Sequence, residues 1–228
     1  MDDKRSIIRE AFTLSIPVAT GFIPLGAAFG ILMHSIGYNW MWSGFFSLVA
    51  FAGSIQYLSI SFLTGPFNPV NAFLVSLMVN ARHLFYGISL MDKYKDSGRY
   101  KNYLILGMCD ETFSITSTLD IRDKKRRDTM NFYITLFDHT YWVVGSVLGG
   151  LIAGTVNFNT MGMDFALTAL FVVLFIEQMT KKKNRPAGFI GILASIISII
   201  FFGAENMIIP AMVMILAVFL SGGDKLCS

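Results

Sequence analysis

The stretch that decides the fold class lies near the start of the chain, where residues 12–34 read FTLSIPVATGFIPLGAAFGILMH. It holds no Asp, Glu, Lys or Arg. About 20 apolar residues in a helix cross the ~30 Å hydrocarbon core of a bilayer, and backbone groups in lipid must bond within the helix. Lys4, Arg5 and Arg9 precede the stretch, but it is too long for a signal peptide and shows no clear cleavage site. We therefore interpret it as the first membrane segment.

Comparable apolar blocks follow along the chain, separated by short polar or charged loops. Of the 228 residues, 54% are hydrophobic and 14% are charged, whereas soluble domains carry about 25% charged residues. The net charge of +3 lies in these loops and does not indicate nucleic-acid binding. We predict one integral membrane transporter domain over residues 1–228, an all-α polytopic bundle of seven or eight segments. The predicted segments are 12–34, 40–63, 70–91, 103–119, 132–156, 163–180, 187–203 and 206–221.

Basic loops predict the orientation, because Lys and Arg favour the cytoplasmic side of a membrane. With eight spans and a cytoplasmic N-terminus, the inner side receives most of them, and the exception is the basic loop 92–102 on the outer side. The segment 103–119 that follows is short and carries Asp110 and Glu111 near its middle. An alternative is that this segment is re-entrant or broken, which gives seven spans. The sequence leaves both topologies open.

A glycine pattern suggests an internal repeat. At a fixed offset of 124 residues, three glycines of the first segment recur in the fifth: Gly21, Gly26 and Gly30 as Gly145, Gly150 and Gly154. Small residues at this spacing permit close helix packing, and glycine-interrupted helices in two halves are typical of transporter repeats. Chance coincidence is the alternative.

Ionisable groups inside apolar segments are the strongest functional signal, because they are costly in lipid unless they face a cavity or a partner. The first cluster comprises Asn80, Arg82, His83 and Tyr86. Arg82 can grip a carboxylate with two hydrogen bonds. The alternative is that Arg82 extends to the membrane interface.

The second cluster is a polar stripe that includes Asp110, Glu111 and Ser114. Adjacent carboxylates in a low dielectric repel, so one of them can carry a proton. The alternative is a short interfacial helix whose acids face water. A pairing of Arg82 with Asp110 or Glu111 is a hypothesis.

The third set consists of helix-interrupting and small residues in the first two segments. Prolines at 17 and 24 free backbone carbonyls that can coordinate a ligand, although a packing kink explains them equally. For Asp138 and His139, early in the predicted fifth segment, a proton relay is one interpretation, and their position near a basic loop favours the other, an interfacial pair. The substrate- or ion-binding candidates are Gly21, Pro24, Gly26, Gly53, Gln56, Asn80, Arg82, His83, Tyr86, Asp110, Glu111 and Ser114.

No enzymatic signature is present in the sequence. It lacks a His-Glu-x-x-His zinc motif, a Gly-x-Ser-x-Gly motif and a phosphate-binding glycine loop. Three histidines in three segments are a poor basis for a metal centre. We therefore predict no catalytic residue, no metal and no cofactor.

Several stretches resemble the AzlC family, the large subunit of two-component branched-chain amino acid permeases. They are PLGAAFG at 24–30, FAGSIQ at 51–56, NARHLFYG at 80–87, DETF at 110–113 and GMDFALTALF at 162–171. The resemblance implies export of branched-chain amino acids across a prokaryotic cytoplasmic (inner) membrane. It also implies a small membrane partner subunit of the AzlD type.

Two lines of reasoning thus lead to a secondary transporter that exports branched-chain or other small hydrophobic amino acids. Arg82 and a broken helix end would hold the substrate carboxylate, and Asp110 or Glu111 its ammonium group. The alternatives are a membrane-embedded enzyme that uses the Arg, Asp, Glu and His cluster, or a channel lined by the polar stripe.

Overall fold

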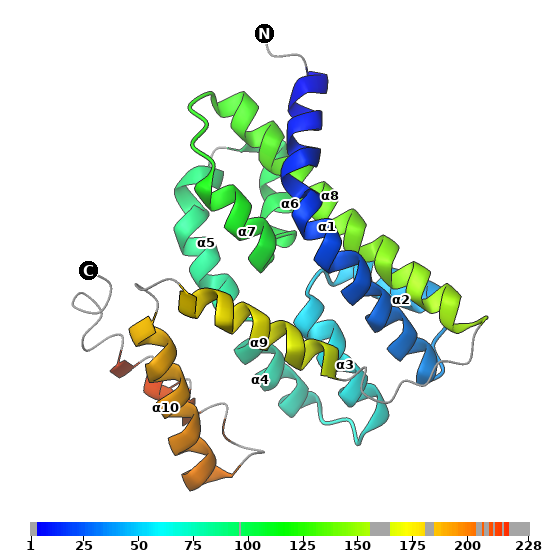
Figure 1. The fold of residues 1–228 in the computed structure, drawn as a ribbon, viewed down its shortest axis with the longest axis vertical. Coiled ribbons are helices and arrows are strands. Elements are labelled where there is room, and N and C mark those ends of the chain that lie inside the picture. Colours follow the sequence, from blue (N-terminus) through cyan, green and yellow to red (C-terminus); the bar gives the residue numbers. More distant parts are fainter. Residues whose placement is uncertain are drawn as a thin grey trace. The chain divides into compact units, whose positions relative to one another are not determined.

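A computed structural model describes residues 4–95, 97–155, 165–180 and 185–203, and a few positions between 207 and 218. All regular elements in these ranges are helical, which confirms the all-α prediction (Figure 1). They are α1 (Lys4–Ser35), α2 (Trp40–Val49), α3 (Gly53–Thr64), α4 (Pro69–Val79), α5 (Ala81–Tyr94), the 3-10 turn η1 (Gly98–Tyr100), α6 (Lys101–Leu106), α7 (Asp110–Thr118), α8 (Lys124–Ala153), α9 (Phe165–Thr180) and α10 (Arg185–Phe202).

The chain divides into two compact units, Met1–Ala166 and Leu167–Ser228. In the second unit, Arg185 Nε donates to the Met179 carbonyl over 3.1 Å. This contact joins the end of α9 to the start of α10. The predicted eighth segment, 206–221, lies largely outside the described residues. A single domain over 1–228 stays a prediction.

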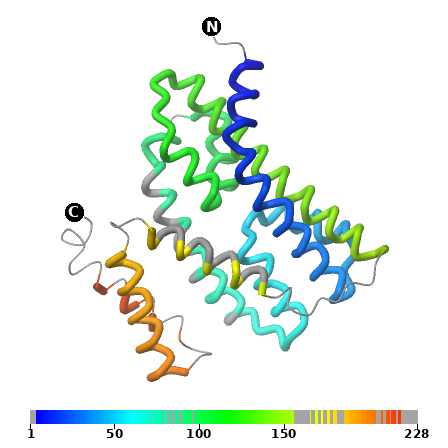
Figure 2. Tube along the Cα trace, viewed as in Figure 1, coloured from blue at the N-terminus to red at the C-terminus, as the bar shows by residue number. Residues whose placement is uncertain are grey.

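The first unit is built on α1 and α8, two long helices that run parallel (Figures 1 and 2). Near their starts Arg126 forms an ion pair of 2.7 Å with Glu10, and near their ends Gly154 lies beside His34. A Cβ added at Gly26 would come within 2.8 Å of the Trp142 carbonyl oxygen. Glycines therefore allow the two backbones to touch, as expected for close helix packing in membranes.

Most of the repeated glycines lie in this contact between α1 and α8. Gly26 faces Gly145, and Gly30 faces Gly150, so members of both glycine sets meet in one interface. Gly21 is exposed, with nothing within 4 Å of an added Cβ. Close packing of α1 on α8 thus explains most of the pattern, and the internal repeat stays a prediction.

The predicted second span, 40–63, is a hairpin of two helices instead. α2 begins where Trp40 packs on Gly150 of α8, and at the turn the Phe51 ring stacks on His139 at 4.5 Å. α3 then returns in the direction from which α2 came, and Tyr57 donates to the Leu25 carbonyl over 2.7 Å. The prediction of a single span is wrong here, because the chain reverses at residues 50–52.

The predicted segment 103–119 forms a second hairpin, which approaches from the opposite end of α8. Tyr100, just before α6, packs on Phe132 with ring centroids 4.7 Å apart. At the turn, Thr112 donates to Asp138, farther along α8, over 2.7 Å. The chain then returns, because Leu119 after α7 packs with Ile7 near the start of α1. Of the two topologies left open for this segment, the structure shows the broken one.

Helices α4 and α5 form a nearly continuous path between the two ends, interrupted at Asn80 with φ −88° and ψ 0°. The loop after α5 lies at the same end as the start of α8, since Ser97 donates to Asp128 over 3.1 Å. A surface hollow there brings Lys4, Arg99 and Arg126 together. The prediction that loop 92–102 lies opposite the N-terminus is therefore wrong: the two hairpins turn back instead of crossing.

Unlike a typical soluble protein, the first unit exposes many large apolar side chains and buries polar ones beside its apolar core. Fully buried side chains include Ser15, Gln56 and Asp138, whereas large apolar ones such as Val49 (67% exposed) and Leu106 (78%) face outward. Such a surface needs an apolar environment. By length and composition alone, two described helices, Lys4–Ser35 and Arg185–Phe202, are long and apolar enough to cross a membrane.

Candidate functional site

The two hairpins converge on the middle of α8, where His139 contacts both. Its Nδ1 lies 3.1 Å from the Tyr103 hydroxyl on α6, in the second hairpin. Its Nε2 lies 3.3 Å from the Ser47 carbonyl oxygen on α2, in the first hairpin. One imidazole thus connects segments that enter from opposite ends of the unit.

Asp138, the neighbouring residue, is completely buried. The Thr112 hydroxyl donates to its Oδ2 over 2.7 Å and also lies 3.1 Å from the Cys109 sulfur. Oδ1 of Asp138 has no hydrogen-bond partner among the described residues. The interpretation of Asp138 and His139 as an interfacial pair is wrong, because α8 begins at Lys124, not near 132, and this places both residues at its centre.

A buried polar face runs along α8 and includes Asp138. Its members recur every three or four residues, which places them on one side of a helix. The buried residues of this face are Asp128, Asn131, Thr135, Asp138, Trp142 and Ser146. This spacing is readable in the sequence, and it is the signal that would have identified Asp138 as an interior residue.

Gln56 belongs to a separate network between the first hairpin and α8. Its amide nitrogen donates to Ser47 Oγ over 3.2 Å, and its oxygen accepts from the Trp142 indole N–H. Ser47 Oγ in turn donates to Ser146 Oγ over 2.7 Å. This network satisfies the buried amide and joins α2, α3 and α8, as buried polar groups require.

Four other candidates lie near that network or on α1. Gly53 is in contact with the Trp142 ring, and Gly26 with the Trp142 backbone. Gly21 and Pro24 lie on the exposed side of α1. None of these four, nor Gln56, lines the cavity described next, and a ligand role for them stays a prediction.

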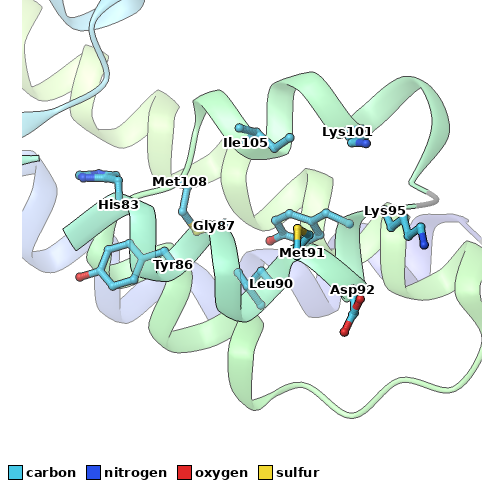
Figure 3. A pocket seen from close by; sticks show the side chains of 11 residues that line it. His83, Tyr86, Gly87, Leu90, Met91, Asp92, Lys95, Lys101, Ile105 and Met108 are labelled. Carbon is cyan, nitrogen blue, oxygen red and sulfur yellow. The ribbon is translucent and has the colours of Figure 1, made fainter. Parts of the chain in front are cut away.

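A cavity of about 620 Å³ lies between α5 and α6 (Figure 3). Its walls are mainly apolar and include Leu90, Met91, Ile105 and Met108. His83 and Tyr86 line one end, and Asp92, Lys95 and Lys101 line the other. The volume falls within the range of about 300–1,000 Å³ that small-molecule sites occupy.

The end of the cavity that His83 and Tyr86 line brings together three of the predicted site residues. The Tyr86 hydroxyl donates to Asp110 Oδ1 over 2.8 Å, and the His83 ring lies 5.6 Å from the Tyr86 ring. Asp110 and Glu111 form the first turn of α7. Met108, in the turn before α7, also lines the cavity. The cavity therefore reaches the tip of the second hairpin.

The remaining candidates are placed less directly. Asn80 lies at the junction of α4 and α5, and Ser114 is exposed on α7. The side chain of Arg82 lies outside the described residues. Its pairing with Asp110 or Glu111 therefore remains a hypothesis.

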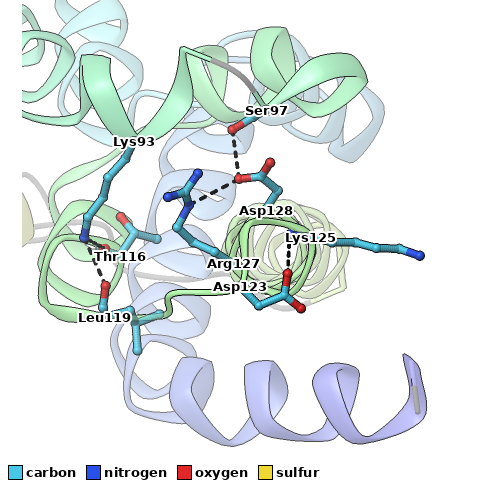
Figure 4. A network of polar contacts seen from close by, with 8 residues as sticks. All are labelled: Lys93, Ser97, Thr116, Leu119, Asp123, Lys125, Arg127 and Asp128. Carbon is cyan, nitrogen blue, oxygen red and sulfur yellow. Dashed lines mark hydrogen bonds and ion pairs between the residues drawn. The ribbon is translucent and has the colours of Figure 1, made fainter. Parts of the chain in front are cut away.

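Lys93 fixes the far end of the second hairpin (Figure 4). Its ammonium group donates to the carbonyl oxygens of Thr116, Ser117 and Leu119 at 3.0–3.1 Å. The last carbonyls of a helix have no partner within the helix, so a cation there satisfies them. Lys93 thus attaches α7 to α5.

We expect Lys93→Met to lower the free energy of unfolding by about 1.5–3 kcal/mol, because hydrogen bonds to a charged group are lost. Thermal unfolding of the detergent-solubilised protein measures the change. Lys125→Met, which alters an exposed lysine on α8, serves as the control. Equal stability of both variants would show that Lys93 does not hold the hairpin.

Comparisons with known proteins place the sequence among membrane proteins of one family. The AzlC protein family model matches residues 17–156. The branched-chain amino acid transport protein AzlC of Bacillus subtilis is 48% identical over 95% of this chain and 87% of its own length. An uncharacterized membrane protein of Haemophilus influenzae is 33% identical over 90% of the chain and 84% of its own length. The inner membrane protein YgaZ of Escherichia coli is 26% identical, covering 80% and 78%. No solved structure matches the chain significantly.

Proposed function

The chain belongs to the AzlC family, and from this premise we propose that it is a secondary transporter for branched-chain or other small hydrophobic amino acids. It exports them across the cytoplasmic membrane of a prokaryote, as a multi-pass protein that acts with a small AzlD-type subunit. The relative from Bacillus subtilis, named for branched-chain amino acid transport, supports this substrate class.

One observation carries the proposal: two helical hairpins approach from opposite ends and meet at His139 in a polar interior. Discontinuous helices whose ends lie at the middle of the membrane are typical of secondary transporters. They place unpaired backbone groups in the interior, and hairpins that enter from opposite ends can each open toward one side. This arrangement favours a carrier over an open pore.

The distribution of charge supports an orientation for the first unit. Its basic end holds the N-terminus, loop 92–102 and the loop before α8, whereas connections 36–39 and 65–68 at the other end contain no Lys or Arg. By the positive-inside rule, the basic end faces the cytoplasm. The exposed apolar side chains between the ends face lipid or the partner subunit.

The cavity between α5 and α6 is the substrate site in this proposal. Leu90, Met91, Ile105 and Met108 suit an aliphatic side chain. The end with His83, Tyr86 and the bonded Asp110 suits the charged ammonium and carboxylate groups. Arg82, in the same helix, is the proposed partner of the carboxylate.

Exchange in proteoliposomes tests the function. Vesicles that contain the protein and its small partner are loaded with leucine, and uptake of labelled leucine is followed. We expect saturable exchange that valine and isoleucine inhibit and that glutamate does not. No exchange with any aliphatic amino acid would refute the proposal, and flux that rises linearly with concentration would point to a channel instead.

A further inference from the structure

We propose that Asp138 carries the proton that couples transport to the pH gradient. This inference deepens the proposed function and rests on it. It assigns a role to a buried residue that lies outside the substrate cavity, at the contact between α8 and the tip of the second hairpin.

The geometry of the carboxyl group supports this role. Asp138 is 0% exposed, accepts one hydrogen bond from Thr112 and has its second oxygen unbonded within the described part of the chain. The ion pairs among the described residues do not involve it. An isolated buried carboxylate costs several kcal/mol, whereas a neutral carboxyl group does not carry this penalty. A bound proton therefore suits the carboxyl group in this arrangement.

In the part of the chain that the structure describes, no titratable group around Asp138 supplies a compensating cation. Those that face it within the described ranges are Cys109, Glu111 and Tyr103, all from the second hairpin. The adjacent His139 directs its ring to Tyr103 and to the Ser47 carbonyl, not to Asp138. Loss of the proton would place a negative charge near Glu111, and like charges in a low dielectric repel.

A route for the proton lies on the buried face of α8. Asn131 is 1% exposed, and neither polar atom of its amide has a hydrogen-bond partner among the described residues. Thr135, one turn farther, lies between Asn131 and Asp138 and is also fully buried. Buried groups of this kind ordinarily bind water or an ion. Asn131 and Thr135 thus lead from the basic end of the unit toward Asp138.

The step is a proton transfer without redox chemistry. The O–H bond of the Asp138 carboxyl breaks, the electron pair stays on the carboxylate, and water on the open side accepts the proton. Among the described residues no cation faces the new charge, and Glu111 lies near it, which favours separation of the hairpin tip from α8. Protonation removes this repulsion: leucine exchange proceeds with the proton bound, and release of the proton is needed only for net flux driven by the pH gradient.

Asp138→Asn tests the proposal, because an amide imitates the protonated carboxyl and cannot release a proton. In proteoliposomes with the partner subunit, we expect Asp138→Asn to keep leucine exchange at equal pH within about twofold and to lose acceleration by a pH gradient. Asp128→Asn is the control: Asp128 lies on the same buried face but is bonded to Ser97 and Arg127. It should retain both activities.

The outcomes separate the two proposals. If the wild-type protein shows no exchange, the proposed function fails. If wild-type exchange is present and Asp138→Asn still responds to the pH gradient, or if a sodium gradient alone drives wild-type flux, the coupling role is overturned. Loss of exchange in Asp138→Asn also counts against it, provided that the variant is folded.

A measurement on the wild-type protein covers the case in which that variant does not fold. Dicyclohexylcarbodiimide reacts with protonated carboxyl groups in apolar surroundings. We expect mass spectrometry to find the adduct on Asp138, and pH-driven flux to fall in proportion to labelling. Labelling that leaves Asp138 unmodified while flux is lost would overturn the proposal.

Discussion

Gly87→Trp is expected to abolish leucine exchange while the protein remains folded. Gly87 lines the cavity between α5 and α6, and an added Cβ there meets nothing within 4 Å. The indole would therefore extend into the space assigned to the substrate side chain without displacing a neighbour. Tryptophan also has a higher helix propensity than glycine, so the backbone of α5 does not suffer.

The expected loss in exchange rate is on the order of 100-fold, since a substrate that cannot reach its bound position loses the benefit of orientation. Leucine exchange in proteoliposomes is the measurement, with Gly87→Ala as an intermediate step that should cost much less. Leu106→Trp is the matched control: this residue follows Ile105 on α6 but is 78% exposed and does not line the cavity. Normal exchange by Gly87→Trp would place the substrate elsewhere.

Gly149→Leu is expected to prevent stable association of α1 with α8. A Cβ at this position would collide with the carbonyl group of Ala27, which belongs to the backbone and cannot rotate away. The two helices would have to separate along their whole contact. We expect the free energy of unfolding to fall by more than about 3 kcal/mol, beyond the range of ordinary overpacking.

Size-exclusion chromatography and thermal unfolding in detergent measure this effect. Gly21→Leu is the control. Gly21 also lies in a long helix, but it is exposed and has open space around it. The control should stay within about 1 kcal/mol of the wild type. Similar stability of the two variants would mean that close contact of α1 and α8 is not needed for the fold.

The hairpins show why hydropathy alone misjudged the topology. Segment 40–63 has the length and the apolar composition of a span, yet the chain reverses within Ala50-Phe51-Ala52. A helical hairpin that faces lipid has the same apolar composition as a single helix that spans the membrane, so hydropathy does not distinguish them. In segment 103–119 the sequence itself pointed to a break, because Asp110 and Glu111 near its middle are costly in a helix that faces lipid.

In the candidate site, too, the sequence predicted some features correctly and missed others. The motif around residues 80–87 and the acids at 110–111 predicted that these segments carry function, and Tyr86 does bond to Asp110. Asp138 was missed because the charged residues 124–127 were interpreted as a loop, whereas they form the first turn of α8. Because α8 begins well before the apolar block, Asp138 lies at the centre of the helix and not at the membrane interface.

By itself, the sequence determined that the protein is helical, that apolar helices dominate it, and which polar residues need a partner or a cavity. These follow from local physics: backbone groups in lipid must bond within helices, and buried charges are costly. Only the tertiary structure decided that two helical segments reverse, that both meet at His139, and that Asp138 is enclosed. Those facts depend on contacts between residues far apart in the chain, and hydropathy carries no information about them.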